Sequence, residues 1–380
     1  MGSNTESDHA ALRKISAGAK AGESLRNRVH TGEAEPAKLV SIKDIARSAK
    51  VSHSTVSRAL NNSPRVKSDT VERIRRIAEE AGYRGSAIAR SLATRRTKTI
   101  GVVVTTIADL FAAGVVSGIE TVAGDNGYSV VLANSNADPE REKRVVRTLE
   151  ERRVDGIIVT ASRVGALYLP LLSRMNVPIV LLNNQHPSEF AHSVMIENFS
   201  ASYEATRHLV ELGHRRIAYI GDRNGSQSDT DRFGGYRQAL DSGQLPFQPE
   251  LVVYGSGTPE SGMEVMATLL GLAAPPTAVF CYDDMTALGA MRQIHASGRH
   301  VPRDVSVIGF DDLSIVQFTE PPLTTIRQPM TEMGRLAMEA VLDLLGGSGS
   351  THEIKVRGEL VVRASTGPPK GKAPNSDSHV

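Results

Sequence analysis

Apolar runs alternate with amphipathic segments along the chain from Thr99 onward. TIGVVV, SVVLAN, DGIIVT and PIVLLN come first, and the alternation then starts again with VMIE, RIAYIG, LVVYG, TAVFCYD and VSVIGFDD. Apolar runs of about five residues between helices are typical of parallel strands buried on both faces. The pattern therefore predicts an α/β core of two doubly wound lobes, with a ligand cleft at the carboxyl ends of the strands.

Short helices are expected ahead of this core. The stretch 40–60, VSIKDIARSAKVSHSTVSRAL, predicts two helices joined by a tight turn. Ser41 is a suitable N-cap with Asp44 three residues later, and a second helix is expected to follow Ser52. Ser68 is expected to cap a third helix. The segment is either an all-α helix-turn-helix headpiece or an ordinary helical hairpin with a solvated face.

The outward side chains of the second predicted helix are short and polar or basic. They are His53, Ser54, Thr55, Ser57 and Arg58. Side chains of these types can reach base edges and phosphates in a major groove without a bulky clash. The helix therefore fits a DNA-reading role.

Residues 42–104 carry motifs that are much more specific than helix-turn-helix spacing. The stretch is IKDIARSAKVSHSTVSRALNNSPRVKSDTVERIRRIAEEAGYRGSAIARSLATRRTKTIGVVV, with VS-x-x-TVSR-x-LN, GY-R and ARSLATRRT-x-TIGVV in order. It resembles the lactose/galactose repressor (LacI/GalR) family of bacterial transcription factors. The resemblance extends from about Leu39 to Gly367 and implies the type I periplasmic-binding-protein fold for the two lobes.

The resemblance also implies how DNA would be bound. In the family, the segment matching 86–97 becomes a hinge helix on operator binding, and the leucine matching Leu92 wedges apart a base step in the minor groove. The implied DNA-binding residues come from the first two helices, the end of the headpiece and the hinge: Ser41, His53, Ser54, Thr55, Ser57, Arg58, Asn61, Tyr83, Leu92 and Ala93.

These observations divide the chain into five parts. They are a disordered tail at 1–37, the headpiece at 38–85, the hinge at 86–98, the core at 99–366 and a second disordered tail at 367–380. Both tails are poor in large apolar residues, so they cannot bury enough surface to fold. We expect the first lobe at about 99–197 and 323–348, and the second at about 198–322 and 349–366.

Charge separates the parts more clearly than the net value of +2. Lys38 to Lys98 holds 15 basic and 5 acidic residues, whereas Thr99 to Val380 holds 24 and 32. A basic block beside an acidic body is the electrostatic pattern of a module that binds phosphates. A single cysteine, Cys281, excludes an internal disulfide, and no apolar run approaches the roughly 18 residues of a membrane span, so we expect a cytoplasmic protein.

Polar residues that follow the predicted strands are candidates for binding a ligand. They are Asp109 with Phe111, Thr160, Asn183, Arg232, Asp283 and Asp311. In the resembling family, Arg232 in DRFGGY matches the effector-binding arginine and Asp311 in GFDD the effector-binding aspartate. Asp283 stands where many relatives have asparagine, and Gly257 stands where several have an aromatic residue. The set suits a sugar or another small polar metabolite, hydroxyl-rich or amine-bearing in preference to phosphorylated.

The sequence thus predicts a homodimeric repressor that binds a pseudo-palindromic operator under control of a small effector. Two alternatives use the same fold. One is a regulator controlled by a partner protein, and the other is a solute-binding transport component, which would need a secretion signal and no basic headpiece. We expect no enzyme, cofactor or metal, because the chain has no Gly-x-Ser-x-Gly elbow and no cluster with metal-ligand spacing.

Overall fold

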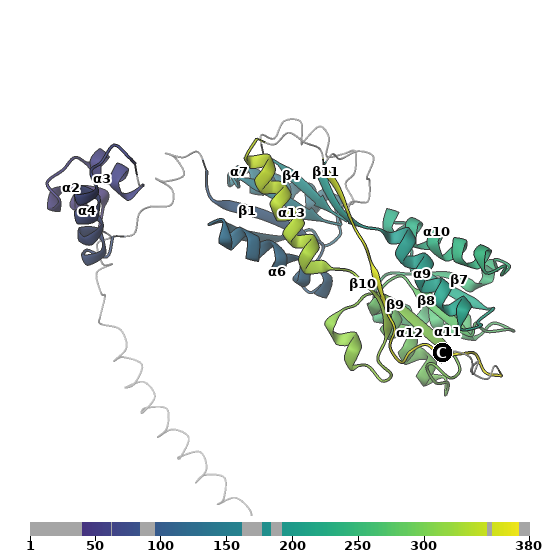
Figure 1. Cartoon of the computed structure of the whole chain (residues 1–380). Coiled ribbons are helices and arrows are strands. Elements are labelled where there is room, and N and C mark those ends of the chain that lie inside the picture. The colour runs from purple at the N-terminus through teal and green to yellow at the C-terminus, as the bar shows by residue number, and fades with distance from the viewer. Residues whose placement is uncertain are drawn as a thin grey trace, which may run out of the picture. The chain divides into compact units, whose positions relative to one another are not determined.

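The computed structural model describes residues 40–61, 63–83, 96–161, 177–183, 192–347 and 352–371. The chain forms two compact units, of which the first ends at Arg90 and the second begins at Ser91 (Figure 1). The predicted tail at 1–37, most of the hinge with Leu92 and Ala93, and the end of the second tail lie outside the described residues.

The described part of the first unit contains three helices and a small core. Helices α2 (Ile42–Ser48), α3 (His53–Leu60) and α4 (Ser68–Glu80) enclose a core of Ile45, Ala46, Ala49, Val56, Ala59, Ile74 and Ala78. The predicted caps of the first two helices form: Asp44 Oδ2 accepts from Ser41 N at 3.0 Å, and Ser52 Oγ accepts from Thr55 N at 3.2 Å. The third cap was predicted one residue late: Ser68 is the first residue of the helix, and Lys67 occupies the N-cap position without a side-chain hydrogen bond.

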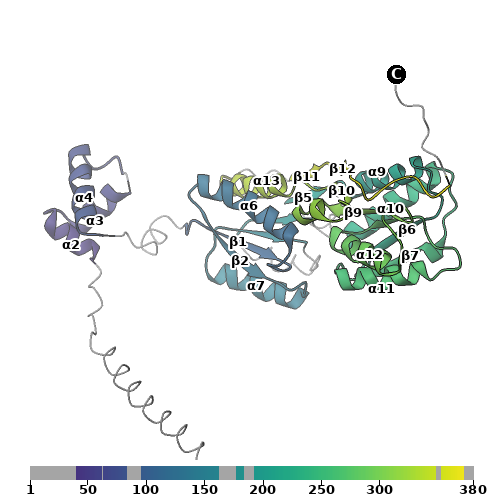
Figure 2. The same ribbon diagram turned by 90° about the horizontal axis from the view of Figure 1, so that it is seen from below.

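The first lobe of the second unit is built on an all-parallel sheet. Its strand order is β11-β5-β4-β3-β1-β2. The strands are β1 (Thr99–Val104), β2 (Ser129–Asn134), β3 (Gly156–Thr160), β4 (Ile179–Leu182), β5 (His192–Ile196) and β11 (His352–Val356). Helices α6 (Leu110–Asp125) and α13 (Met330–Leu345) lie side by side on one face, and α7 (Pro139–Glu151) covers the other (Figure 2).

Close packing of α6 on α13 depends on two glycines. A Cβ at Gly118 would lie 2.0 Å from the carbonyl oxygen of Thr331, and one at Gly334 would lie 2.0 Å from that of Val115. No side chain fits at such distances, so the two backbones approach each other through their glycines.

The second lobe repeats the plan with one strand reversed. Its strand order is β12-β10-β9-β8-β6-β7, and only β12 runs antiparallel to its neighbour among the described strands. The strands are β6 (Ile217–Asp222), β7 (Val252–Gly255), β8 (Ala278–Cys281), β9 (Ser306–Asp311), β10 (Thr324–Arg327) and β12 (Glu359–Val361). Helices α9 (Asn198–Glu211) and α10 (Gln227–Ser242) pair on one face, and α11 (Pro259–Leu270) and α12 (Asp284–Ala296) on the other; two 3-10 helices, η3 (Pro249–Leu251) and η4 (Ser314–Phe318), complete the lobe (Figure 2).

Two of the predicted lobe boundaries are wrong. Strand β10, expected in the first lobe, pairs with β9 and β12 in the second sheet, so within the predicted segment 323–348 only α13 belongs to the first lobe. Conversely, β11 pairs with β5 in the first sheet, and only β12 belongs to the second. A run of four or five apolar residues predicts a strand but does not specify which sheet receives it.

Among the described elements, the chain crosses between the lobes three times, after β5, β10 and β11. The crossings contact one another: Glu197 N donates to Val356 O at 2.9 Å, and a Cβ at Gly358 would lie 2.9 Å from Ile326 Cγ2 and 3.1 Å from Ile196 Cδ1. In Figure 1 the yellow end of the chain runs along this junction.

The predicted second tail begins too early. Gly367 N donates to Ser306 Oγ at 3.1 Å, Gly367 O lies 2.9 Å from His214 Nε2, and Lys370 pairs with Asp304. Residues 367–371 are therefore held on the second lobe, through backbone groups that a composition argument does not detect.

Candidate functional site

Four of the residues predicted to contact DNA lie on one face of α3. Ser54, Ser57, Arg58 and Asn61 recur at intervals of three or four and so share one side of the helix, opposite buried Val56. Other predicted contacts flank this face: His53 and Ser41 are exposed, whereas Thr55 and Tyr83 are half-buried.

Hydroxyl groups at the start of α3 are already organised. Ser52 Oγ lies 2.8 Å from both Ser54 Oγ and Thr55 Oγ1, and Asn61 Nδ2 donates to Ser57 O at 2.9 Å. Arg58 is exposed. Hydroxyl groups held in a row beside the exposed guanidinium of Arg58 can contact both base edges and phosphates.

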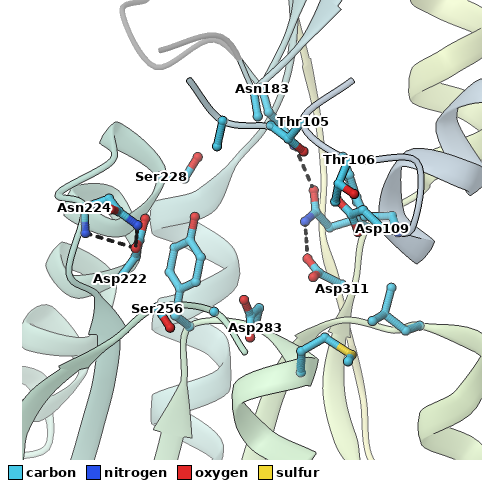
Figure 3. A pocket seen from close by; sticks show the side chains of 18 of the residues that line it. Thr105, Thr106, Asp109, Asn183, Asp222, Asn224, Ser228, Ser256, Asp283 and Asp311 are labelled. Carbon is cyan, nitrogen blue, oxygen red and sulfur yellow. Dashed lines mark hydrogen bonds between the residues drawn. The ribbon is translucent and has the colours of Figure 1, made fainter. Parts of the chain in front are cut away.

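A second candidate site is a cavity of about 390 Å³ between the lobes of the second unit. Its walls come from the loops that follow the carboxyl ends of strands in both sheets, as Figure 3 shows. The first lobe contributes Thr105, Thr106, Ala108, Asp109, Phe111, Ala137, Ala161 and Asn183; the second contributes Asp222, Asn224, Ser228, Arg232, Ser256, Gly257, Tyr282, Asp283, Met285, Asp311, Leu313 and, at the crossing after β10, Gln328.

Six of the seven residues predicted from the sequence line this cavity. They are Asp109, Phe111, Asn183, Arg232, Asp283 and Asp311. Thr160 does not: it is buried in β3, where its Oγ1 donates to Val103 O at 3.3 Å, and the next residue, Ala161, reaches the wall instead. Sequence reasoning missed Asp222 and Tyr282, which the strand-end rule could have found at RIAYIGD and TAVFCYD, and Gln328, which carries no such signal.

Arg232 is held in place by the second lobe. Its Nε donates to Asn198 Oδ1 at 2.8 Å and its Nη1 to Tyr282 O at 2.5 Å. The guanidinium carbon lies 3.5 Å from the ring centroid of Phe310 and 4.5 Å from that of Tyr282. The cation is therefore stacked on aromatic faces and fixed in orientation at the cavity wall.

A polar contact links the two lobes at the back of the cavity. Gln328 Nε2 donates to Asp311 Oδ1 at 2.5 Å, and Asn183 Nδ2 lies 3.5 Å from Gln328 Oε1 (Figure 3). Asp311 and Asp312 both have positive φ, at 121° and 57°, an uncommon conformation for residues other than glycine. Asp312 is anchored by Arg327 Nε at 2.7 Å and Arg363 Nη2 at 2.6 Å, so the surrounding contacts hold the turn in this conformation.

Burial raises the pKa of several carboxyl groups at this site. It does so for Asp109 and Asp283, which cap α6 and α12 by accepting from Phe111 N at 2.9 Å and Thr286 N at 2.7 Å. It also raises the pKa of Asp311 well above the ordinary value; the charge of Arg232 opposes this shift, whereas those of Asp284 and Asp283 add to it. Each charged form loses hydration that the protein only partly replaces.

Asp284 lies directly behind the cavity and is fully buried. Its Oδ1 accepts from Thr325 Oγ1 at 2.6 Å and its Oδ2 from Leu313 N at 2.8 Å. Burial raises the pKa of this carboxyl to about 7. One side chain on α12 thus ties the Asp311–Leu313 turn to β10, the strand that precedes a lobe crossing.

Within the described ranges, no group of His, Cys, Asp and Glu side chains is arranged to hold a metal ion. In the same ranges, no helix has the length and apolar character needed to span a membrane.

Sequence comparisons identify both units. Residues 41–86 match the family of bacterial regulatory proteins called the lacI family, and residues 206–366 match a periplasmic binding protein-like domain. The chain is 37% identical over 327 residues to the HTH-type transcriptional repressor CytR of Escherichia coli (strain K12), covering 86% of this chain and 96% of the relative. It is 35% identical over 332 residues to the HTH-type transcriptional repressor PurR of Haemophilus influenzae (strain PittEE), covering 86% and 98%.

Solved structures agree with this assignment. The lac repressor dimer bound to operator and the anti-inducer ONPF matches with a TM-score of 0.80 and 30% identity, over 87% of this chain and 100% of that one. The complex of transcriptional regulator CelR with cellobiose matches with a TM-score of 0.66 and 33% identity, over 86% and 99%. The predicted fold and family are therefore confirmed, and the chain belongs to the lacI family of bacterial regulatory proteins.

Proposed function

We propose that the protein is a homodimeric, sequence-specific DNA-binding repressor whose operator affinity is controlled by a small polar metabolite, a sugar or sugar derivative. Two features of this one chain carry the proposal. They are helix α3, which has a polar and basic face, and the polar cavity between the two lobes. Its relatives CytR and PurR are named as transcriptional repressors, and we assign no catalytic activity to this chain.

The first unit would bind DNA through α3. Arg58 and the hydroxyls of Ser54 and Ser57 would face the major groove, and the excess of basic residues between Lys38 and Lys98 would bind phosphates. Two copies related by a twofold axis would read the two halves of a pseudo-palindrome, as the dimeric state of the operator-bound lac repressor suggests. The segment 86–98 would serve as the hinge, with Leu92 and Ala93 entering the minor groove. A repressor must reach the chromosome, so we place the protein in the bacterial cytoplasm.

The cavity of the second unit would bind the effector. Asp109, Asn183 and Asp311 offer acceptors for hydroxyl groups, and Arg232 offers a fixed planar donor. Cellobiose in the CelR complex is a ligand of this hydroxyl-rich class.

Ligand control would act through the relative angle of the lobes. A ligand that binds one arrangement more tightly than another shifts the population toward it, and the linkage also changes operator affinity. The contact from Asn183 through Gln328 to Asp311 lies between the lobes and would respond to an effector bound there.

The test uses the purified full chain alone. A duplex is first selected from a random pool by the protein, and its binding is then followed by fluorescence anisotropy with and without polar metabolites. We expect a salt-sensitive, sequence-specific complex whose affinity changes when an effector is present. Failure to select any duplex would refute the DNA-binding half of the proposal. A response that required an added protein would favour a partner-controlled regulator instead.

Two substitutions separate the two sites. Arg58→Ala should weaken operator binding, whereas Arg292→Ala, which removes one exposed positive charge from the second lobe, should not. Arg232→Ala should keep operator binding and lose the effector response. A normal effector response in Arg232→Ala would show that the cavity has been assigned wrongly.

A further inference from the structure

Two carboxyl groups in the cavity form no direct ion pair with a described side chain. Asp283 and Asp311 line the same cavity, and neither forms an ion pair within 4.0 Å with any side chain in the described part of the chain. Burial raises the pKa of both groups, and the charge of Arg232, which lowers both, only partly offsets this effect. A ligand that brings a positive charge to this position would recover that lost stabilisation.

Arg232 does not neutralise these two carboxylates by direct contact. Its Nε and Nη1 are directed at Asn198 Oδ1 and the carbonyl oxygen of Tyr282, and its plane is stacked on Phe310 and Tyr282. The side chain is almost fully buried and cannot swing toward the acidic pair without breaking these contacts. The positive charge at the wall is therefore fixed, and it is outnumbered by the carboxyl groups around the cavity.

The second oxygen of Asp283 borders Gly257, which also lines the cavity. Oδ1 accepts from Thr286 N at 2.7 Å as the cap of α12, whereas Oδ2 faces Gly257 across the cavity wall. A Cβ at Gly257 would lie 3.0 Å from Oδ2, so any other residue there would crowd this oxygen. Gly257 also has φ +75°, a conformation that favours glycine. Figure 3 shows Asp283 with Ser256 on one side and Asp311 on the other.

We propose that the effector carries a cationic nitrogen, an ammonium or amidinium group, which binds between Asp283 and Asp311, and that Asp283 sets this specificity. The inference rests on the proposed ligand-controlled function and narrows its ligand class. Hydrogen bonds from a cationic donor to carboxylates are about twice as strong as neutral ones. A neutral polyol would add no charge to stabilise the ionised form of either carboxyl group, and an anion would be repelled by that form.

The test asks which charge class of metabolite stabilises the protein. A bacterial small-molecule extract is separated by ion exchange at pH 7 into cationic, neutral and anionic fractions. The melting temperature of the full chain is measured in dilutions of each fraction, because a ligand that binds only the native state raises it. Asp283→Asn is compared with Asp138→Asn, which alters the cap of α7 outside the cavity in the same way. Asparagine can keep the cap at both positions, so both variants should fold.

We expect the cationic fraction to raise the melting temperature of the wild-type protein and of Asp138→Asn. In Asp283→Asn, the amount of that fraction needed for a half-maximal shift should rise about 10- to 100-fold, the loss expected for a charge-assisted hydrogen bond. Stabilisation by the neutral or anionic fraction alone, or an unchanged response in Asp283→Asn, would overturn the inference while leaving the proposed ligand control intact. No stabilisation by any fraction would count against both, and operator selection would still test the DNA-binding role separately.

Discussion

Replacing Asp284 with asparagine should make the core more resistant to unfolding at neutral and alkaline pH. The native pKa of this carboxyl is raised by burial to about 7, whereas an unfolded chain has the ordinary value of 3.8. The folded protein therefore binds a proton that the unfolded protein releases between these two values. Stability associated with this proton is fully present below pH 3.8 and is lost as the pH rises through 7.

The magnitude follows from the size of the pKa difference. One pKa unit corresponds to about 1.4 kcal/mol, so a shift of about 3 units corresponds to about 4 kcal/mol over the whole range. Roughly 2.5 kcal/mol of this should appear between pH 5 and pH 8. Asparagine preserves the geometry, because its carbonyl can accept from Leu313 N and its amide can donate to Thr325 Oγ1.

The assay is urea unfolding of the full chain at several pH values, followed by circular dichroism. Labelling of Cys281, the only cysteine, reports locally, because this thiol is buried in β8 close to Asp284 in sequence. Asp304→Asn is the control: Lys370 holds the pKa of Asp304 far below its usual range, so the Asp304 contribution is lost only in strong acid. Its difference from wild type should be nearly constant from pH 5 to pH 8. If Asp284→Asn and wild type show the same pH dependence in this window, the reasoning about Asp284 is wrong.

Two further predictions concern the packing of the two lobes. Gly334→Ala should lower the unfolding free energy by about 2 kcal/mol or more, because its Cβ would lie 2.0 Å from Val115 O and must push α6 away from α13. Gly346→Ala is the matched control, because the atom nearest to its Cβ would lie at 3.3 Å. Equal urea midpoints for the two variants would contradict this prediction. Tyr219→Phe should lower the unfolding free energy by about 1–3 kcal/mol in the same measurement, because it removes the phenol hydroxyl that donates to buried Asp229 Oδ1 at 2.7 Å. An unchanged unfolding free energy would mean that water or another donor replaces this hydroxyl.

Sequence reasoning found residues that line the cavity where a polar side chain follows a buried strand. Asn183 follows β4 directly, Asp311 ends β9, and Asp109 and Asp283 lie in the loops after β1 and β8, so the rule for parallel sheets brings them to one edge. It failed at Thr160, because this last residue of β3 turns its hydroxyl back to Val103 O, a choice that depends on local backbone direction.

Gln328 could not be found in this way, because its place in the cavity depends on the lobe crossing after β10. The lobes predicted for β10 and β11 were also interchanged, because the sequence does not show where the chain crosses from one lobe to the other. Strand runs such as TTIR and HEIKV have no pattern that distinguishes one sheet from the other, so only tertiary contacts decide between them.

The three crossings together limit how the two lobes of the second unit can move relative to each other. A single tether would let one lobe swivel about any axis, whereas three tethers held side by side behave like a strap and leave one easy bending axis. Twisting about the long direction would have to pull Val356 away from Glu197 and open the tight fit at Gly358, so this motion is mechanically stiff. A ligand bound between the lobes should therefore rotate one lobe toward the other about a nearly fixed axis.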